Sequence, residues 1–255
     1  MSDERNMYAG FLSGNALKII ACVTMLIDHI GMMFFPDVVV WRIIGRLSMP
    51  LFAFTFAEGC HYTRNKIKHF VLVLAMGIVT SVGMSVAAGY VQGNILVTLS
   101  MSCLLIYALD GIKRSAFDGN GRMAAIYAVA FALVTGGSVW LCCFSGIYID
   151  YGIAGVALPL TVRLLDFRSF GATGMLADIY NPATVFTLFA IGLIVLAVVL
   201  GPVQAFGIFA MIPVAMYSGK RGTAKLKYMF YVFYPAHLIV LAVIYVIVFP
   251  SVLTG

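Results

Sequence analysis

Charged residues are scarce in this chain. Only 10% of its 255 residues are Asp, Glu, Lys or Arg, whereas a soluble domain carries about 25%. Hydrophobic residues, by contrast, make up 62% of the chain. So little charge cannot cover the surface of a water-soluble fold of this size. The composition therefore indicates a polytopic membrane protein with most of its mass in the bilayer.

Familiar catalytic and metal-binding motifs are missing as well. The sequence has no GxxxxGK[ST] phosphate loop, no GxSxG nucleophile elbow, no HExxH zinc motif and no pair of carboxylates near the middle of the membrane. Its cysteines form no CxxC pair or other metal-ligand spacing, so we expect small buried hydrophobes and no metal. The five cysteines are Cys22, Cys60, Cys103, Cys142 and Cys143.

Long apolar runs dominate what is present. About nine runs are close to the roughly 17–25 residues that a helix needs to cross the hydrocarbon; the sixth and eighth fit this pattern least well. Because backbone groups in lipid must satisfy their own hydrogen bonds, we predict an all-α, polytopic integral membrane bundle of about nine transmembrane helices, a single membrane-embedded domain over residues 1–255. The runs lie near residues 16–35, 41–62, 69–90, 95–112, 123–144, 147–165, 183–201, 203–218 and 228–250.

Basic residues gather on one side of this predicted bundle. Fourteen of the 16 Lys and Arg residues fall on or near the side that holds the N-terminus. The positive-inside rule then predicts a cytoplasmic N-terminus and an outer C-terminus in the cytoplasmic (inner) membrane, and the basic loops can contact anionic lipid. The net charge of +6 therefore reports topology, and we expect no nucleic-acid partner.

Asp28 and His29 lie deep in the first predicted helix, within LKIIACVTMLIDHIG. Ionisable residues at that depth are costly, so they are candidates for function. Lys18 precedes His29 by about three helical turns, so both project from nearly the same face, about 16 Å apart along the axis. Burial favours the neutral imidazole that a general base requires. The structural alternative is a core histidine bonded to a backbone carbonyl.

Arg42 and Arg46 begin the second predicted helix and share a face. Arg46 should lie at a depth similar to that of Asp28, and a buried Asp needs a cation, so we predict an Asp28–Arg46 pair. Such a pair either staples the first helical hairpin or helps to hold His29 or a substrate.

Polar groups also mark the outer ends of later helices. Asn94 precedes the fourth predicted helix, and Asp150 and Tyr151 precede the sixth. These residues either form helix caps and turns or line the entrance of an acceptor together with Arg42 and Arg46.

The cytoplasmic end carries candidates for cofactor binding. Glu58 is either a counter-ion of Lys18 or Arg64, or it shapes the mouth of a channel. In the last helix, Tyr234 and His237 lie too deep for an aromatic belt, so we expect them to line a polar cavity. The basic residues that could hold the phosphates of coenzyme A are Lys18, Arg64, Lys220, Arg221, Lys225 and Lys227.

Six motifs, in order along most of the chain, resemble the TraX family: LKxxAxxTMxIDHIG, RIIGRLSMPLFAF, EG, TRN, DYGIAGV and KLKYxFYxFYPxH. This family comprises membrane proteins associated with conjugation, and its namesake N-acetylates F-pilin. TraX-like proteins are in turn similar to the acyltransferase 3 superfamily, whose first helix carries a basic residue, ten intervening residues and a catalytic histidine. Lys18 and His29 match that pattern, with Lys where Arg is more usual.

The resemblance implies an acyltransferase 3-like, acyl-CoA-dependent membrane transferase. Acetyl-CoA would enter from the cytoplasm, and an acceptor amine or hydroxyl, on a peptide such as a pilin N-terminus or on a glycan, would enter from the outer face. His29 is the expected general base, supported by Asp28. Two alternatives remain: a proton-coupled permease that uses Asp28, His29 and Arg46 as a relay, and a non-enzymatic assembly factor.

Overall fold

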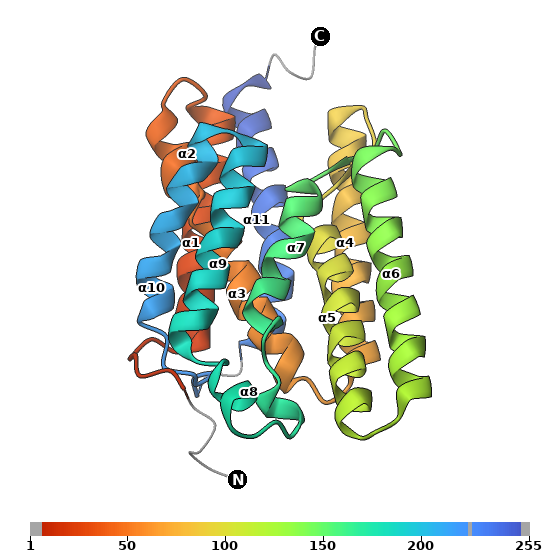
Figure 1. Ribbon diagram of the computed structural model, residues 1–255. Coiled ribbons are helices and arrows are strands. Elements are labelled where there is room, and N and C mark those ends of the chain that lie inside the picture. The colour runs from red at the N-terminus through yellow and green to blue at the C-terminus, as the bar shows by residue number, and fades with distance from the viewer. Residues whose placement is uncertain (1–6, 224–225, 251–255) are drawn as a thin grey trace. The chain divides into compact units, whose positions relative to one another are not determined.

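The computed structural model describes residues 7–223 and 226–250, and these residues are almost entirely helical (Figure 1). Within them, seven helices are long and apolar enough to cross a membrane. This confirms an all-α, multi-pass membrane protein. The seven are α1 (Gly14–Phe34), the stretch Val39–Tyr62 that comprises α2 (Val39–Gly45) and α3 (Ser48–Tyr62), α4 (Lys66–Ala88), α5 (Ile95–Phe117), α6 (Gly121–Cys143), α9 (Pro182–Leu200) and α11 (Lys227–Val248).

The other two predicted spans form shorter helices. Residues 147–165 contain α7 (Gly152–Arg163), and residues 203–218 contain the 3₁₀-helix η2 (Pro202–Ala210) followed by α10 (Met211–Ala215). Both are apolar, but neither has the length of a conventional transmembrane helix. By length and composition, the predicted number of nine is therefore not confirmed.

The chain folds as two compact units, and each is described by itself. The first unit comprises residues 1–52 and 200–255, and the second comprises residues 53–199. The boundary between residues 52 and 53 falls inside α3. The first unit thus holds α1, α2, η2, α10 and α11, and the second holds α4 to α9.

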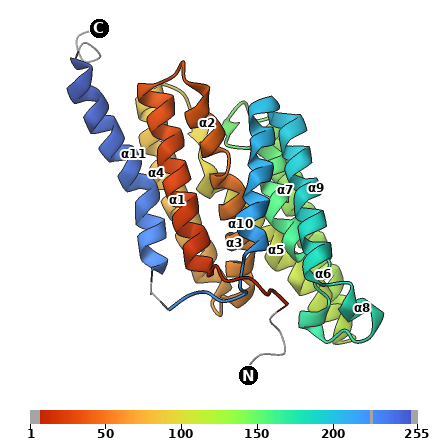
Figure 2. The same ribbon diagram turned by 90° about the vertical axis from the view of Figure 1, so that its left-hand side faces the viewer.

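In the first unit, α1 and α11 run side by side in the same direction. Lys18 lies over the ring of Phe230 near the start of both helices, and His29 contacts His237 further along both. Figure 2 shows α1 between α11 and α10. The start of α1 and the end of α11 therefore lie at opposite ends of this unit.

The segment 202–215 is longer along its axis than an α-helix with the same number of residues. Gln204, near its start, bonds to Arg46, whereas Tyr217, just past its end, pairs through its backbone with Gly10 and Leu12, immediately before α1. A 3₁₀-helix rises about 2.0 Å per residue and an α-helix about 1.5 Å, so η2 and α10 together extend about 25 Å. The segment therefore accompanies most of α1, in the opposite direction.

In the second unit, α7 runs beside α5 in the same direction (Figure 1). The short strands β1 (Gln92–Gly93) and β2 (Tyr148–Ile149) pair in parallel, so α5 and α7 start together. Thr98 donates to the carbonyl of Asp150 at 2.6 Å, and Lys113 donates to the carbonyl of Arg163 at 2.6 Å. The α7 segment therefore follows α5 for about 22 Å, from Thr98 to Lys113. It then continues through η1 (Arg168–Phe170) and α8 (Met175–Asp178) to α9.

Candidate functional site

A cluster of polar side chains lies where α1 meets α2 in the first unit. The Asp28 carboxylate accepts two hydrogen bonds from Nη2 of Arg46, at 2.7 and 2.8 Å, and forms an ion pair with Nη1 of Arg42 at 3.0 Å. The Asp28–Arg46 pair predicted from the sequence is confirmed. One carboxylate faces two guanidinium groups, so this part of the cluster carries one net positive charge.

Two glycines let the helices approach closely enough for these bonds. A Cβ on Gly45 would lie 2.1 Å from Oδ1 of Asp28, and a Cβ on Gly31 would lie 2.1 Å from Cβ of Trp41. Any larger side chain at these positions would push α2 away from α1. The ion pairs between α1 and α2 therefore depend on the two glycines as well as on the charged residues.

Gln204 joins this cluster from η2, and the sequence analysis did not select it. Its Oε1 accepts a hydrogen bond from Nη1 of Arg46 at 3.2 Å, and the residue is 4% exposed. Among the described residues, its buried Nε2 has no hydrogen-bond acceptor. The available signal was a lone amide in the apolar stretch GPVQAFGIFA.

His29 is oriented by a second histidine and by the backbone carbonyl of Met25, one turn earlier in α1, rather than by a carboxylate. Nδ1 of His29 lies 3.0 Å from Nε2 of His237, and Nδ1 of His237 lies 2.8 Å from the carbonyl oxygen of Phe233. That carbonyl only accepts, so Nδ1 of His237 carries a proton and its Nε2 is the acceptor for Nδ1–H of His29. Asp28, which was expected to support His29, instead faces the two arginines.

This hydrogen-bond chain determines which ring nitrogen of His29 keeps its lone pair. With Nδ1 of His29 protonated, the neutral ring keeps its lone pair on Nε2. His29 is half-buried, whereas His237 is 6% exposed. The outward member of the pair is therefore the one with an available basic nitrogen.

The α1–α11 seam also carries two residues assigned to the cofactor from the sequence. Nζ of Lys18 lies 5.5 Å from the centre of the Phe230 ring, a cation–π distance. Tyr234, one turn further along α11, is buried and packs edge-on against His237. Lys18 and His29 thus both face α11, as their spacing predicts.

The basic loop after α10 closes over the start of α1. The carbonyl oxygens of Lys220 and Arg221 accept hydrogen bonds from the backbone N–H groups of Gly14 and Asn15, and both basic residues are exposed. The structure therefore brings them within one helical turn of Lys18 along the chain direction of α1. The candidate Lys225 lies outside the described residues, as does the side chain of Lys227.

Three further candidates lie at the β1–β2 end of the second unit. Asn94 is completely buried; its amide caps α5 by accepting from the N–H groups of Leu96 and Val97 and donates to the carbonyl of Gly77. Of the two roles that the sequence left open, a helix cap or part of the acceptor entrance, Asn94 has the first. Asp150 is half-buried, and Tyr151 begins α7 in a left-handed backbone conformation, with φ of 61°.

The remaining candidates, Glu58 and Arg64, differ in their surroundings. Arg64 is exposed, whereas Glu58 is 6% exposed and lies close enough to Arg163 and Tyr180 for their charges to interact. Glu58 therefore belongs to a buried charge cluster around Arg163, a cation that was not among the two predicted for it.

Arg163 is the centre of that cluster and is 1% exposed. Its guanidinium pairs with Asp166 and reaches the hydroxyl of Tyr180 at 3.1 Å and Nδ1 of His61 at 2.8 Å. Burial raises the pKa of the Tyr180 hydroxyl although Arg163 opposes the shift, so the phenol stays protonated at neutral pH. With the Lys113 bond to the Arg163 carbonyl, the cluster ties α3, α5 and α7 together.

A third group was hidden because its members are far apart in sequence. Cys60, His69 and Cys103 come from three helices, and their Sγ and Nδ1 atoms lie within 4.8 Å of one another. The sequence predicted small buried hydrophobes for the cysteines and, for His69 at a helix entrance beside basic residues, an interfacial position. Spacing along one chain gives no signal for ligands 34 and 43 residues apart.

The helices and the buried polar cluster define a multi-pass membrane protein. Residues 13–245 match the family described as TraX protein, and the chain belongs to this family. It is 26% identical to a probable fimbrial assembly protein FimC, serogroup H1, of Dichelobacter nodosus, over 88% of this chain and 92% of that protein. It is also 25% identical to an uncharacterized protein of Rickettsia prowazekii (strain Madrid E), over 64% of this chain and 72% of that protein. No solved structure matches it.

Proposed function

We propose that this protein is an acyltransferase of the cytoplasmic membrane that moves an acetyl group from acetyl-CoA to an acceptor amine or hydroxyl. The observation that carries the proposal is the hydrogen-bond chain from the Phe233 carbonyl through His237 to His29, which leaves Nε2 of His29 as a base. In the proposed reaction, Nε2 takes the proton of the acceptor while the acceptor attacks the thioester carbonyl. The tetrahedral intermediate then collapses with cleavage of the C–S bond, and protonated His29 gives the proton to the departing CoA thiolate. His237 holds the ring in this tautomer throughout.

The surrounding charges suit the negative oxygen that develops during acyl transfer. Asp28 neutralises only one of the two arginines, and the Arg42 side chain is 32% exposed. Arg42 can therefore approach the developing oxyanion, as the donors of an oxyanion hole do. The unpaired Nε2 of Gln204 is a further buried donor beside Arg46 for a carbonyl of the substrate.

The α1–α11 seam gives acetyl-CoA a proposed path. Lys18, Lys220 and Arg221 at the start of α1 would hold phosphates, and the pantetheine arm would follow the seam past Tyr234 to His29. This arrangement matches the acyltransferase 3 superfamily pattern of a basic residue and a histidine in the first helix. In the proposed topology, the start of α1 faces the cytoplasm, so His29 lies nearer the outer face, from which the acceptor would enter.

The similarity to a fimbrial assembly protein suggests a peptide acceptor such as a pilin N-terminus.

A vesicle experiment tests whether the substrates meet across the membrane. Sealed right-side-out vesicles would be loaded with acetyl-CoA labelled in its acetyl group, and an impermeant peptide with a free N-terminus would be added outside. We expect label on the outer peptide with the wild-type protein and none with His29→Ala. Product that forms only when peptide and acetyl-CoA share the inner side would contradict the proposed geometry, and export of intact acetyl-CoA would indicate a permease.

A further inference from the structure

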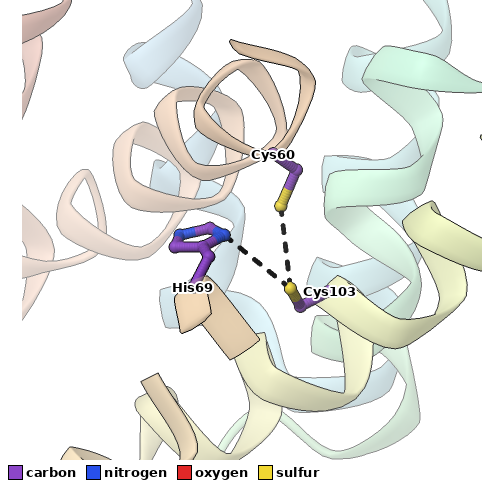
Figure 3. Close-up of side chains that lie close together, drawn as sticks. All are labelled: Cys60, His69 and Cys103. Carbon is purple, nitrogen blue, oxygen red and sulfur yellow. Dashed lines mark hydrogen bonds between the residues drawn. The ribbon is translucent and has the colours of Figure 1, made fainter. Parts of the chain in front are cut away.

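A group of reactive side chains that acyl transfer does not use lies in the second unit. Figure 3 shows Cys60 on α3, His69 on α4 and Cys103 on α5 pointing toward one another. The two Sγ atoms are 4.0 Å apart, and Sγ of Cys103 lies 3.9 Å from Nδ1 of His69. All three residues are buried, with at most 5% exposed. Three ligands of two types, two thiols and one imidazole, that bind soft and borderline metals therefore share one small interior volume.

The spacing of these atoms fits one metal ion. With each pair of ligand atoms at most 4.8 Å apart, a point equidistant from all three lies roughly 2.0–2.5 Å from each. Zinc binds thiolate at about 2.3 Å and imidazole nitrogen at about 2.0–2.1 Å. An ion can therefore occupy the centre after ligand movements of a few tenths of an ångström.

A candidate fourth ligand, the hydroxyl oxygen of Tyr107, lies beside the two sulfurs and the nitrogen. The hydroxyl of Tyr107 lies 2.8 Å from Nδ1 of His69 and interacts with both thiols. Tyr107 follows Cys103 by one helical turn, so both project from one face of α5. On the opposite side, the His69 ring packs against Phe56, with 5.3 Å between ring centres. This apolar contact fixes the plane of the imidazole.

We propose that Cys60, His69 and Cys103 bind Zn²⁺, with the oxygen of Tyr107 in the fourth position. Binding releases the two thiol protons, and the two thiolates then balance the charge of the ion. The bound site then carries no net charge of its own. The ion would join α3, α4 and α5 at a point where no covalent link does, and its binding does not depend on the proposed acyl transfer.

Metal analysis of the purified full-length protein tests the site. The protein would be produced with zinc in the medium, and its metals would be measured by mass spectrometry. We expect one zinc per chain in the wild type, and a loss of at least tenfold in Cys60→Ala and Cys103→Ala. Cys22→Ala, which removes a buried cysteine of α1, is the matched control and should keep its zinc. Wild-type protein without zinc, or with copper in its place, would overturn the proposal.

Cobalt replacement protects the test against variants that fail to fold. Co²⁺ added to the metal-free wild type should give the charge-transfer and visible bands of a tetrahedral thiolate site. A chelator should also lower the melting temperature of the wild type but leave that of Cys103→Ala unchanged. A cobalt spectrum without thiolate bands, or a thiol titration that finds Cys60 and Cys103 joined as a disulfide, would show that these cysteines do not form a zinc site.

Discussion

At the scale of single residues, the direction of one hydrogen bond decides which nitrogen can act. Phe233 offers only a carbonyl oxygen, so His237 must donate to it and must accept from His29. The sequence identified both histidines but assigned His237 to the cofactor. It could not show their contact, because the two residues are 208 positions apart on helices whose packing partners no local pattern specifies.

In the proposed mechanism His237 is a positioning residue, and His237→Gln tests this role. The glutamine amide cannot both donate to Phe233 and accept from His29 in the same geometry. We expect the catalytic rate to fall about 10- to 150-fold, the equivalent of one hydrogen bond to a charged group, while KM for acetyl-CoA stays unchanged. A rise in KM at an unchanged rate would instead place His237 in cofactor binding.

Gly45 illustrates how an absent side chain positions present ones. Gly45→Ala would place a methyl group 2.1 Å from Asp28, so we expect a loss of about 1–3 kcal/mol of stability, as for other overpacked sites. Gly83→Ala in α4 is the control, because nothing lies within 4 Å of its added Cβ, and it should stabilise by about 0.5–1 kcal/mol. Thermal unfolding in detergent measures both; equal melting temperatures would contradict the close approach.

At the scale of elements, the first hairpin was the most predictable part of the site. A buried carboxylate needs a cation, and Arg42 and Arg46 repeat at helical spacing, so the partner of Asp28 followed from the sequence. The participation of η2 did not follow, because a lone amide in an apolar run does not indicate its partner and 3₁₀ geometry is not visible in composition. Likewise, Arg163 looked like part of a basic loop, although it is almost wholly buried.

The ion pairs of this hairpin should be important for its stability. Asp28→Asn leaves Arg42 and Arg46 without their carboxylate, and breaking a buried pair in this way costs about 3–5 kcal/mol. Asp37→Asn, an exposed carboxylate in the turn between α1 and α2, is the control and should cost almost nothing. Unfolding curves of the two variants that coincide would show that the ion pairs do not stabilise the hairpin.

At the scale of the whole molecule, composition fixed the class and overestimated the number of full-length helices. Seven described helices have the length to cross a membrane. The hydrogen bonds at their ends nevertheless show that the α7 segment runs beside α5, and the η2 segment beside α1, for more than 20 Å. A criterion based on the length of one continuous helix misses such segments, because they are short helices that pack along a longer neighbouring helix.

Labelling at three positions distinguishes nine crossings from seven. In vesicles of known orientation, with Cys142 and Cys143 replaced by Ser, an impermeant maleimide would be applied to Val91→Cys, Asp118→Cys and Met175→Cys, all at exposed positions. If the α7 segment crosses, Met175→Cys reacts on the same side as Asp118→Cys, and Val91→Cys reacts on the other. Met175→Cys reacting together with Val91→Cys would leave α7 on the outer side and contradict the proposed topology.

The central claim is that Nε2 of His29 is the base for acyl transfer, and thiol release from acetyl-CoA by the purified protein tests it most directly. We expect His29→Ala to lower the rate about 10²- to 10⁴-fold, the usual contribution of a general base. Thr24→Val is the control, because this buried hydroxyl bonds only to carbonyls of its own helix, and it should retain near wild-type turnover. A folded His29→Ala protein that releases thiol at the wild-type rate would contradict the account.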